Sequence, residues 1–261
     1  MLKKALVLGL VAAAMAALSA PLRSQEKSAA SQPGATQPAG GEAKTYDFDS
    51  NEALAGWTIT GDVTIDLTKG REGKGGALKV GPAGKALLKL RDRDESGKVD
   101  IWVYDDGTKA AEPNVHRAGP RWGLVQSDGR VVAVGALYAP YLSGAITYAA
   151  SDSDGKNFTR VVTYLGLNRA PAGWHKWTFN MDPDKGLTIL HNDKDVNTPK
   201  ARYDWNKSTL KGFSSLAIWG DSGKGGEQTI WVDDVSVTLG GPMKAVPAGP
   251  PPPASKPAAT K

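Results

Sequence analysis

The chain has 261 residues, no Cys and a formal net charge of +5, with 32 Lys plus Arg against 27 Asp plus Glu. Without Cys, a disulfide framework and thiol catalysis are excluded, so the fold must be held by its hydrophobic core or by a metal. The positive charge could suit nucleic-acid binding, but residues 45–239 carry 24 Lys plus Arg against 25 Asp plus Glu. This near-neutral balance disfavours nucleic acid as a partner of the central part.

Residues 1–20 have the layout of a secretory signal peptide. Lys3 and Lys4 precede an apolar run over residues 5–17, and small residues follow up to Ala20, where cleavage is expected. A membrane anchor is the alternative, but a spanning helix needs about 20 apolar residues. The sequence therefore predicts no membrane span and an exported protein that is periplasmic, on the cell surface or extracellular.

Two segments of biased composition flank the central part. Residues 21–44 are rich in Ser, Ala, Gln, Pro and Gly and contain no aromatic residue, which predicts a flexible linker. Residues 240–261 are rich in Pro and Ala and predict a disordered, partly polyproline tail. A solubilising role is the simplest account of this tail, and weak contact of its Lys residues with polyanionic surfaces is the alternative.

The 195 residues from 45 to 239 form one predicted domain. No stretch in it sustains an apolar period of 3.6 residues, and short β-branched or aromatic runs alternate with turn residues. This pattern predicts about a dozen antiparallel strands in an all-β sandwich or barrel. The expected strands are Thr45–Asp49, Trp57–Thr60, Val63–Leu67, Ala77–Val80, Ala86–Leu90, Val99–Tyr104, Trp122–Gln126, Val131–Tyr138, Ile146–Ala149, Phe158–Leu165, His175–Met181, Leu187–His191, Phe213–Trp219 and Thr229–Leu239.

The turns between these strands are predicted by Gly, Pro and Asp. Asp128-Gly129, Asp154-Gly155 and the segment 81–84 (GPAG) provide the positive φ angles that tight hairpin turns need. Residues 181–196, MDPDKGLTILHNDKDV, predict a strand, a turn and a returning strand.

Three stretches of the domain resemble known sandwich proteins. YDFDSNEALAGWTITGDVTID (46–66) and GDSGKGGEQTIWVDDVSV (220–237) resemble the two ends of bacterial jelly-roll carbohydrate-binding modules. GWHKWTFNMDPDKGLTILHNDKDV (173–196) resembles a hairpin of laminin-G-like and concanavalin-type sandwiches. The resemblance implies an antiparallel two-sheet jelly-roll sandwich of the concanavalin A-like type. It also implies a structural Ca²⁺ that joins the first strand to the last, with Asp49 and one of Asp233 or Asp234 among its ligands.

The residues themselves give a physical reason to examine the acidic pair. If Val235 and Val237 face the core, strict alternation places Asp233 on the core side and Asp234 outside. A buried carboxylate without partners is very costly, so an inward Asp233 needs a cation such as Ca²⁺ or several hydrogen-bond donors. The alternative is a bulge or sheet edge where both acids bind backbone groups or Lys.

Sugar binding is the function that the aromatic composition favours. Eight Trp and seven Tyr against four Phe favour rings with a polar group, and a pyranose presents a flat C–H face that stacks on such rings. Trp57, Trp174, Trp177 and Trp231 are assigned mainly to the core. The candidate platform consists of Trp102, Tyr104, Trp122, Tyr138 and Tyr141, with Arg121 as a polar partner.

Catalysis is less well supported by the sequence. The central part has only five Glu, and none of them forms the paired arrangement expected of a glycosidase strand. Among the scattered His residues, His175 is expected to pack inside and His191 to lie exposed at a hairpin end. The sequence therefore predicts an exported, non-catalytic polysaccharide-binding module. A polysaccharide hydrolase or lyase, and a structural or adhesion domain that binds another protein, are the alternatives.

Overall fold

The computed structural model describes residues 41, 43–107, 117–138, 146–153, 160–168, 172–196, 211–221 and 228–243. The predicted signal peptide, most of both flanking segments, the Asp154-Gly155 turn and Tyr141 lie outside these residues. The described part contains fifteen strands and two short 3-10 helices, η1 (Asn51–Leu54) and η2 (Arg71–Gly73). Within it, no helix is both long and apolar enough to cross a membrane.

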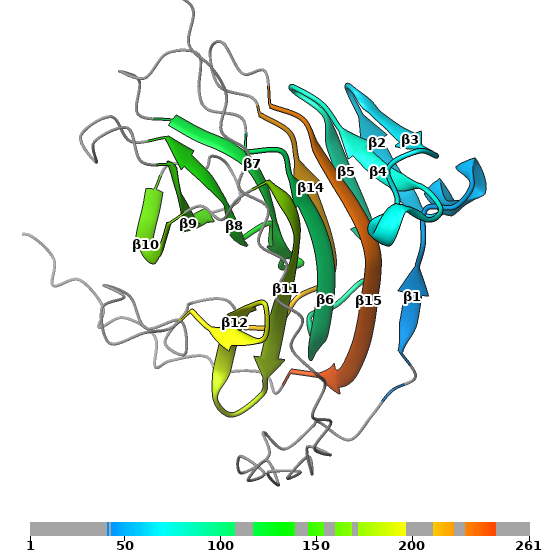
Figure 1. The fold of residues 1–261 in the computed structure, drawn as a ribbon. Coiled ribbons are helices and arrows are strands. Elements are labelled where there is room, and N and C mark those ends of the chain that lie inside the picture. Colours follow the sequence, from blue (N-terminus) through cyan, green and yellow to red (C-terminus); the bar gives the residue numbers. More distant parts are fainter. Residues whose placement is uncertain are drawn as a thin grey trace, which may run out of the picture. The chain divides into compact units, whose positions relative to one another are not determined.

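The strands form two antiparallel sheets, which confirms the predicted all-β, two-sheet jelly-roll sandwich (Figure 1). The eight-stranded sheet has the order β13 (Lys194–Asp195), β12 (Gly186–His191), β11 (Gly173–Asp182), β6 (Glu95–Asp105), β15 (Ile230–Pro242), β4 (Ala77–Val80) and β3 (Val63–Asp66), and β1 (Lys44–Tyr46) also pairs with β15. The seven-stranded sheet has the order β10 (Arg160–Asn168), β9 (Ile146–Ser153), β8 (Val131–Tyr138), β7 (Arg117–Val125), β14 (Ser215–Trp219), β5 (Lys85–Lys89) and β2 (Trp57–Thr60).

The turn residues have two different roles. Asp128-Gly129 joins β7 to β8 with Gly129 at a φ of +86°, and the 181–196 hairpin forms β11 and β12, as predicted. The GPAG segment at 81–84 is not a hairpin turn, and that prediction is wrong. It carries the chain from β4 in the eight-stranded sheet to β5 in the other, because each of these strands pairs within its own sheet.

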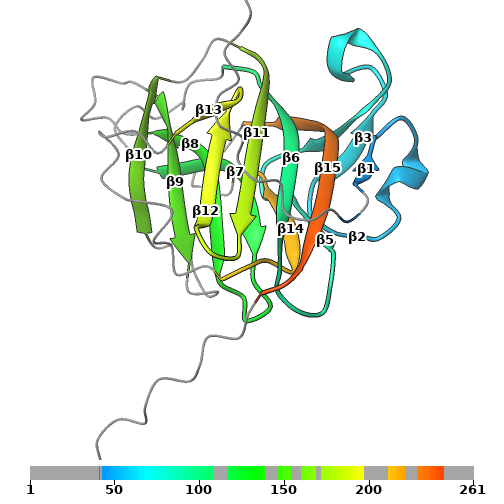
Figure 2. The same ribbon diagram turned by 90° about the horizontal axis from the view of Figure 1, so that it is seen from below.

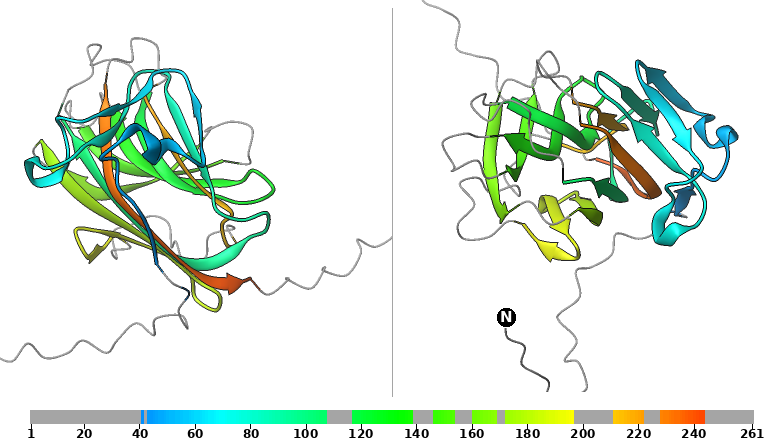
Figure 3. Two further views of the ribbon diagram at one scale, coloured as in Figure 1. Left: turned by 90° about the vertical axis from the view of Figure 1, so that its right-hand side faces the viewer. Right: turned by 45° about the horizontal axis from the view of Figure 1, so that its top comes forward.

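The core lies between the two sheets and is built by alternating side chains. On β6, Val99, Ile101 and Val103 are almost fully buried, whereas Trp102 and Tyr104 point to the outer face and are half-buried. Figure 3 shows the strands of both sheets with no long helix among them. The sandwich is therefore held by apolar side chains that interdigitate between two pleated layers.

The predicted core tryptophans divide between the two faces. Trp57 and Trp177 are buried, with exposed fractions of 8% and 0%, which confirms their assignment. The prediction that Trp174 and Trp231 belong to the core is wrong, since both are half-buried residues on the outer face of the eight-stranded sheet. For Trp174 the reason is simple. It is three residues from Trp177, and an odd separation along a strand places two side chains on opposite faces.

Candidate functional site

The acidic pair lies where β15 changes partners along one edge. β4 pairs with Ile230–Val232, and β1 pairs with Val235–Val237. Figure 1 shows β15 between β6 on one side and β4 and β1 on the other. Asp233 and Asp234 fall in the gap between the two partner strands. The pairing with β6 is also irregular here, because β15 has one residue more than β6 between successive pairs. This is a β-bulge, and Asp234 has a φ of +46°.

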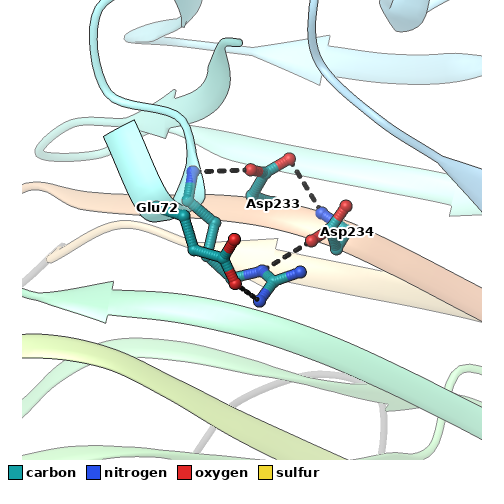
Figure 4. A network of polar contacts seen from close by, with 4 residues as sticks. Glu72, Asp233 and Asp234 are labelled. Atoms are coloured by element: carbon teal, nitrogen blue, oxygen red, sulfur yellow. Dashed lines mark hydrogen bonds and ion pairs between the residues drawn. The ribbon is translucent and has the colours of Figure 1, made fainter. Parts of the chain in front are cut away.

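In this gap the carboxylates accept hydrogen bonds from backbone N–H groups and from the side chain of Arg71 (Figure 4). Asp233 Oδ2 accepts the backbone N–H of Arg71 at 2.9 Å, and Asp233 Oδ1 accepts that of Asp234 at 2.8 Å. Arg71 Nε donates to Asp234 Oδ2 at 2.6 Å. Asp49, which follows β1 in the chain, accepts the backbone N–H of Gly76 through Oδ1 at 3.0 Å. The acids thus join the first strand, the 70–76 segment and the last strand.

Strict alternation predicted an inward Asp233, and this part of the prediction is wrong. The bulge lets Val232 and Val235 both face the core, while Asp233 lies opposite Trp102 on the outer face. Asp233 is nevertheless only 5% exposed, because the segment around Arg71 packs over it. A bulge is present, as in the alternative interpretation, and Asp233 has backbone partners, whereas Asp234 pairs with the side chain of Arg71.

The environment of Asp233 is electrostatically unfavourable for its charge. Burial raises its pKa, the two backbone N–H groups lower it, and the nearby Asp234 and Asp49 carboxylates raise it further, so that the net shift is upward. Among the described residues, no group of three or more acidic or His side chains lies close enough to hold a metal ion.

Three aromatic side chains form a row across the outer face of the same sheet. Trp174 on β11 is directly opposite Tyr104 on β6, which is directly opposite Trp231 on β15. The ring centroids are 5.5 Å apart for Trp174 and Tyr104 and 5.8 Å apart for Tyr104 and Trp231. We call these three residues the aromatic ladder. All three are half-buried, and Figure 2 shows their three strands side by side.

Cationic side chains from the segment after β3 lie against these rings. Lys69 Nζ is 3.9 Å from the ring centroid of Tyr104 and 5.1 Å from that of Trp231. Arg71 lies over Trp102, with Cζ at 4.6 Å from the ring centroid. The indole N–H of Trp231 donates to Asp66 Oδ2 at 2.9 Å, which anchors the end of β3 to the ladder. The result is a surface on which aromatic rings, cationic side chains and carboxylates lie side by side.

The structure divides the predicted sugar-binding residues among different places. Trp102 and Tyr104 share the outer face of the eight-stranded sheet. Trp122 is 2% exposed and packs on Trp177 at 5.5 Å, so its prediction as a platform is wrong, because the ring faces the opposite sheet. Tyr138 is the last residue of β8, its side chain is not among those described, and Tyr141 lies outside the described residues.

Arg121 belongs to the other sheet and does not meet the aromatic ladder. It is opposite Trp219 on β14 and is only 9% exposed. Burial lowers the pKa of its guanidinium, and the charge of the nearby Asp221 carboxylate offsets part of that effect. The predicted partnership of Arg121 with Trp102 and Tyr104 is therefore wrong, because β7 and β6 belong to opposite layers of the sandwich.

A second polar group lies inside the sandwich. The rings of His175 and His191 are 5.3 Å apart, and His191 stacks on Trp177 at 4.5 Å. The buried Tyr148 hydroxyl donates to Asp105 Oδ2 at 2.9 Å and its ring contacts both His rings. Desolvation, with a smaller contribution from His175, lowers the pKa of His191 to about 4. His175 is packed as expected, but His191 is half-buried rather than exposed, because β12 holds it against β11.

Comparisons with known proteins give structural neighbours only. No family model matches the chain, and no curated protein matches it. A carbohydrate esterase of the Shiga toxin-encoding bacteriophage phi24B matches with 15% identity and a TM-score of 0.46, covering 75% of this chain and 96% of that one. The cellulose induced protein Cip1 matches with 14% identity and a TM-score of 0.49, covering 74% and 96%. Peanut lectin matches with 15% identity and a TM-score of 0.46, covering 76% and 98%. The fold assignment rests on the strand order and register of the chain itself.

Proposed function

We propose that the chain is an exported, non-catalytic module that binds a polysaccharide across the aromatic ladder. The observation that carries this proposal is the direct cross-strand alignment of Trp174, Tyr104 and Trp231 on three neighbouring strands. Side chains fixed on strands keep their positions with little loss of conformational entropy on binding. These rings lie outside the core and are only half-buried, so part of their aromatic surface is available to a ligand.

The chemistry of the surrounding side chains suits a sugar. Pyranose rings offer C–H groups to aromatic faces and hydroxyl groups to charged and polar side chains. Lys176 on β11 and Arg71 lie next to Trp102, and Asp66 lies next to Trp231. These groups provide donors and acceptors within reach of the rings, which is the combination that a polyhydroxylated ligand requires.

Replacing Trp174 by alanine should lower the affinity for a bound polysaccharide about tenfold or more, because Trp174 contributes a ring to the ladder. The measurement is retardation of the full chain in native gels that contain a panel of plant, fungal and bacterial polysaccharides. Trp174→Phe should retain most of the binding, since it keeps an aromatic face.

Trp219→Ala is the matched control, because Trp219 is a half-buried Trp on the seven-stranded sheet. It should leave retardation unchanged. If Trp219→Ala abolished binding and Trp174→Ala did not, the binding surface would be on the other sheet. If no polysaccharide retarded the wild-type chain, the proposal would fail.

We also infer that a structural Ca²⁺ binds where Asp49 and Asp233 meet the 70–76 segment. Asp234 is already paired with Arg71, so Asp49 and Asp233 are the carboxylates that would hold the ion. Ca²⁺ takes six to eight oxygen ligands, so backbone carbonyls of the 70–76 segment would have to supply others. The upward shift in the pKa of Asp233 supports the inference, because a cation would relieve that unfavourable charge.

Calcium should therefore raise the unfolding temperature. At a free concentration ten times the dissociation constant, a single site stabilises the native state by about 1.4 kcal/mol. The measurement is thermal unfolding of the full chain in calcium and after addition of a chelator, with magnesium as the control ion. Equal unfolding temperatures in all three conditions would contradict the site.

A further inference from the structure

Most cations on the outer face of the eight-stranded sheet are neutralised by carboxylates. Arg71 pairs with Asp234 and with Glu72, at 2.6 Å and 2.9 Å. Lys176 Nζ is 2.9 Å from Asp193 Oδ1, and Lys98 Nζ is 2.7 Å from Asp100 Oδ2. These pairs leave little net charge to attract an anion from solution.

Two Lys residues near the aromatic ladder, Lys69 and Lys79, do not form such ion pairs with any described residue. Within the described part of the chain, neither Lys69 nor Lys79 has a carboxylate at ion-pair distance. Lys69 lies over Tyr104 and Trp231. Lys79 on β4 is directly opposite Trp231. Lys79 also interacts electrostatically with the Asp66 carboxylate, which accepts the indole N–H of Trp231. The Trp231 end of the ladder therefore carries two ammonium groups and one carboxylate, and the other end is the ring of Trp174.

The position of Lys69 makes its ammonium group suitable for an anion. Contact with two rings removes part of its hydration, and a cation–π contact leaves N–H groups free to donate elsewhere. A half-buried ammonium binds an anion more strongly than one in bulk water, because the local dielectric constant is lower. Both Lys69 and Lys79 are half-buried. Lys69 Nζ is 5.1 Å from the ring centroid of Trp231, and Lys79 is the cross-strand neighbour of Trp231, so the anionic groups of one ligand chain can contact both Lys residues.

We propose that this surface selects acidic polysaccharides. Uronate carboxylates or sulfate esters bind Lys69 and Lys79, while the sugar rings of the same chain lie on Trp174. The proposal rests on the proposed sugar-binding function and adds the chemical class of the ligand to it. Charge complementarity at one end of the ladder and stacking at the other set the direction in which the polysaccharide lies.

The experiment uses pairs of polysaccharides that differ only in charge. Polygalacturonate is compared with its methyl ester, and dextran sulfate with dextran, so that carboxylate and sulfate are tested separately. The full chain should bind at least one acidic member about tenfold more tightly than its neutral counterpart. Lys69→Gln should lower that affinity about five- to tenfold and leave binding of the neutral member unchanged, and Lys69→Arg should restore it. Lys79→Gln should have a smaller effect in the same direction.

Lys98→Gln is the matched control, because Lys98 is on the same face of β6 but is already paired with Asp100. Lys98→Gln should leave the affinity for every polysaccharide unchanged. It removes the same amount of charge as Lys69→Gln, so an effect of Lys69→Gln alone cannot come from the net charge of the chain. If the chain binds neutral and acidic members equally, and Trp174→Ala still abolishes binding, the acidic preference is refuted while the sugar-binding function stands. If acidic members bind but neither Lys69→Gln nor Trp174→Ala weakens them, the attraction is non-specific and the proposal is overturned. Binding to no member of either pair refutes the acidic class, whereas failure of the wider panel refutes the function.

Discussion

Replacing Asp233 by alanine should lower the free energy of unfolding by about 3 kcal/mol. The change removes both acceptors from the backbone N–H groups of Arg71 and Asp234. A buried donor left without a partner costs about 1–3 kcal/mol, and relief of the unfavourable carboxylate charge offsets part of this loss. Urea unfolding of the full chain, followed by intrinsic Trp fluorescence, measures the difference.

Two further variants separate the hydrogen bonds of Asp233 from its charge. Asp233→Asn removes the charge and keeps one acceptor, but its amide N–H₂ faces the other backbone N–H, so its stability without calcium should lie between those of the wild type and Asp233→Ala. Asp234→Asn should cost less than about 1 kcal/mol, because it loses a half-exposed ion pair with Arg71 and Asn tolerates the positive φ. A wild-type stability for Asp233→Ala would show that the junction between β4 and β1 does not depend on this side chain.

Acidification should destabilise the sandwich through His191. Its pKa is about 4 in the folded chain against an ordinary value of 6.5. The unfolded chain therefore takes up a proton as the pH falls below about 6.5, while the folded chain stays neutral at this ring until about pH 4. The stability that the neutral ring contributes is complete above pH 6.5 and is lost progressively between these two values. Between pH 7.5 and pH 5 the loss should be on the order of 2 kcal/mol.

His191→Phe is the variant that tests this pH dependence. Phenylalanine keeps the stacking on Trp177, and within the described residues the buried Nε2 of His191 has no hydrogen-bond partner to lose. The variant should be as stable as the wild type at pH 7.5 and should lose about 2 kcal/mol less between pH 7.5 and pH 5. Unfolding in urea at both pH values, at one ionic strength, gives the four free energies that are needed. Identical pH slopes for the two proteins would contradict the role of His191.

Local patterns of residues predict much of the fold. Alternation along β6 correctly places Val99, Ile101 and Val103 inside, and Trp102 and Tyr104 outside. These features depend on neighbours in the chain, because a strand repeats its side-chain direction every two residues. The same rule, applied to the three-residue separation of Trp174 and Trp177, would have placed Trp174 on the outer face.

The sequence by itself therefore predicted most of the strands, the hairpins at Asp128-Gly129 and at 181–196, and which side chains of a regular strand share a face. Only the tertiary structure decided that Asp233 is outside, because one additional residue in a bulge reverses the alternation after it. Tertiary structure also decided which sheet each strand joins. Arg121 and Trp102 are therefore separated, while Lys69, Tyr104, Trp174 and Trp231 meet on one surface. Pairing between strands that are distant in sequence depends on packing of the whole core, and no local pattern of residues specifies it.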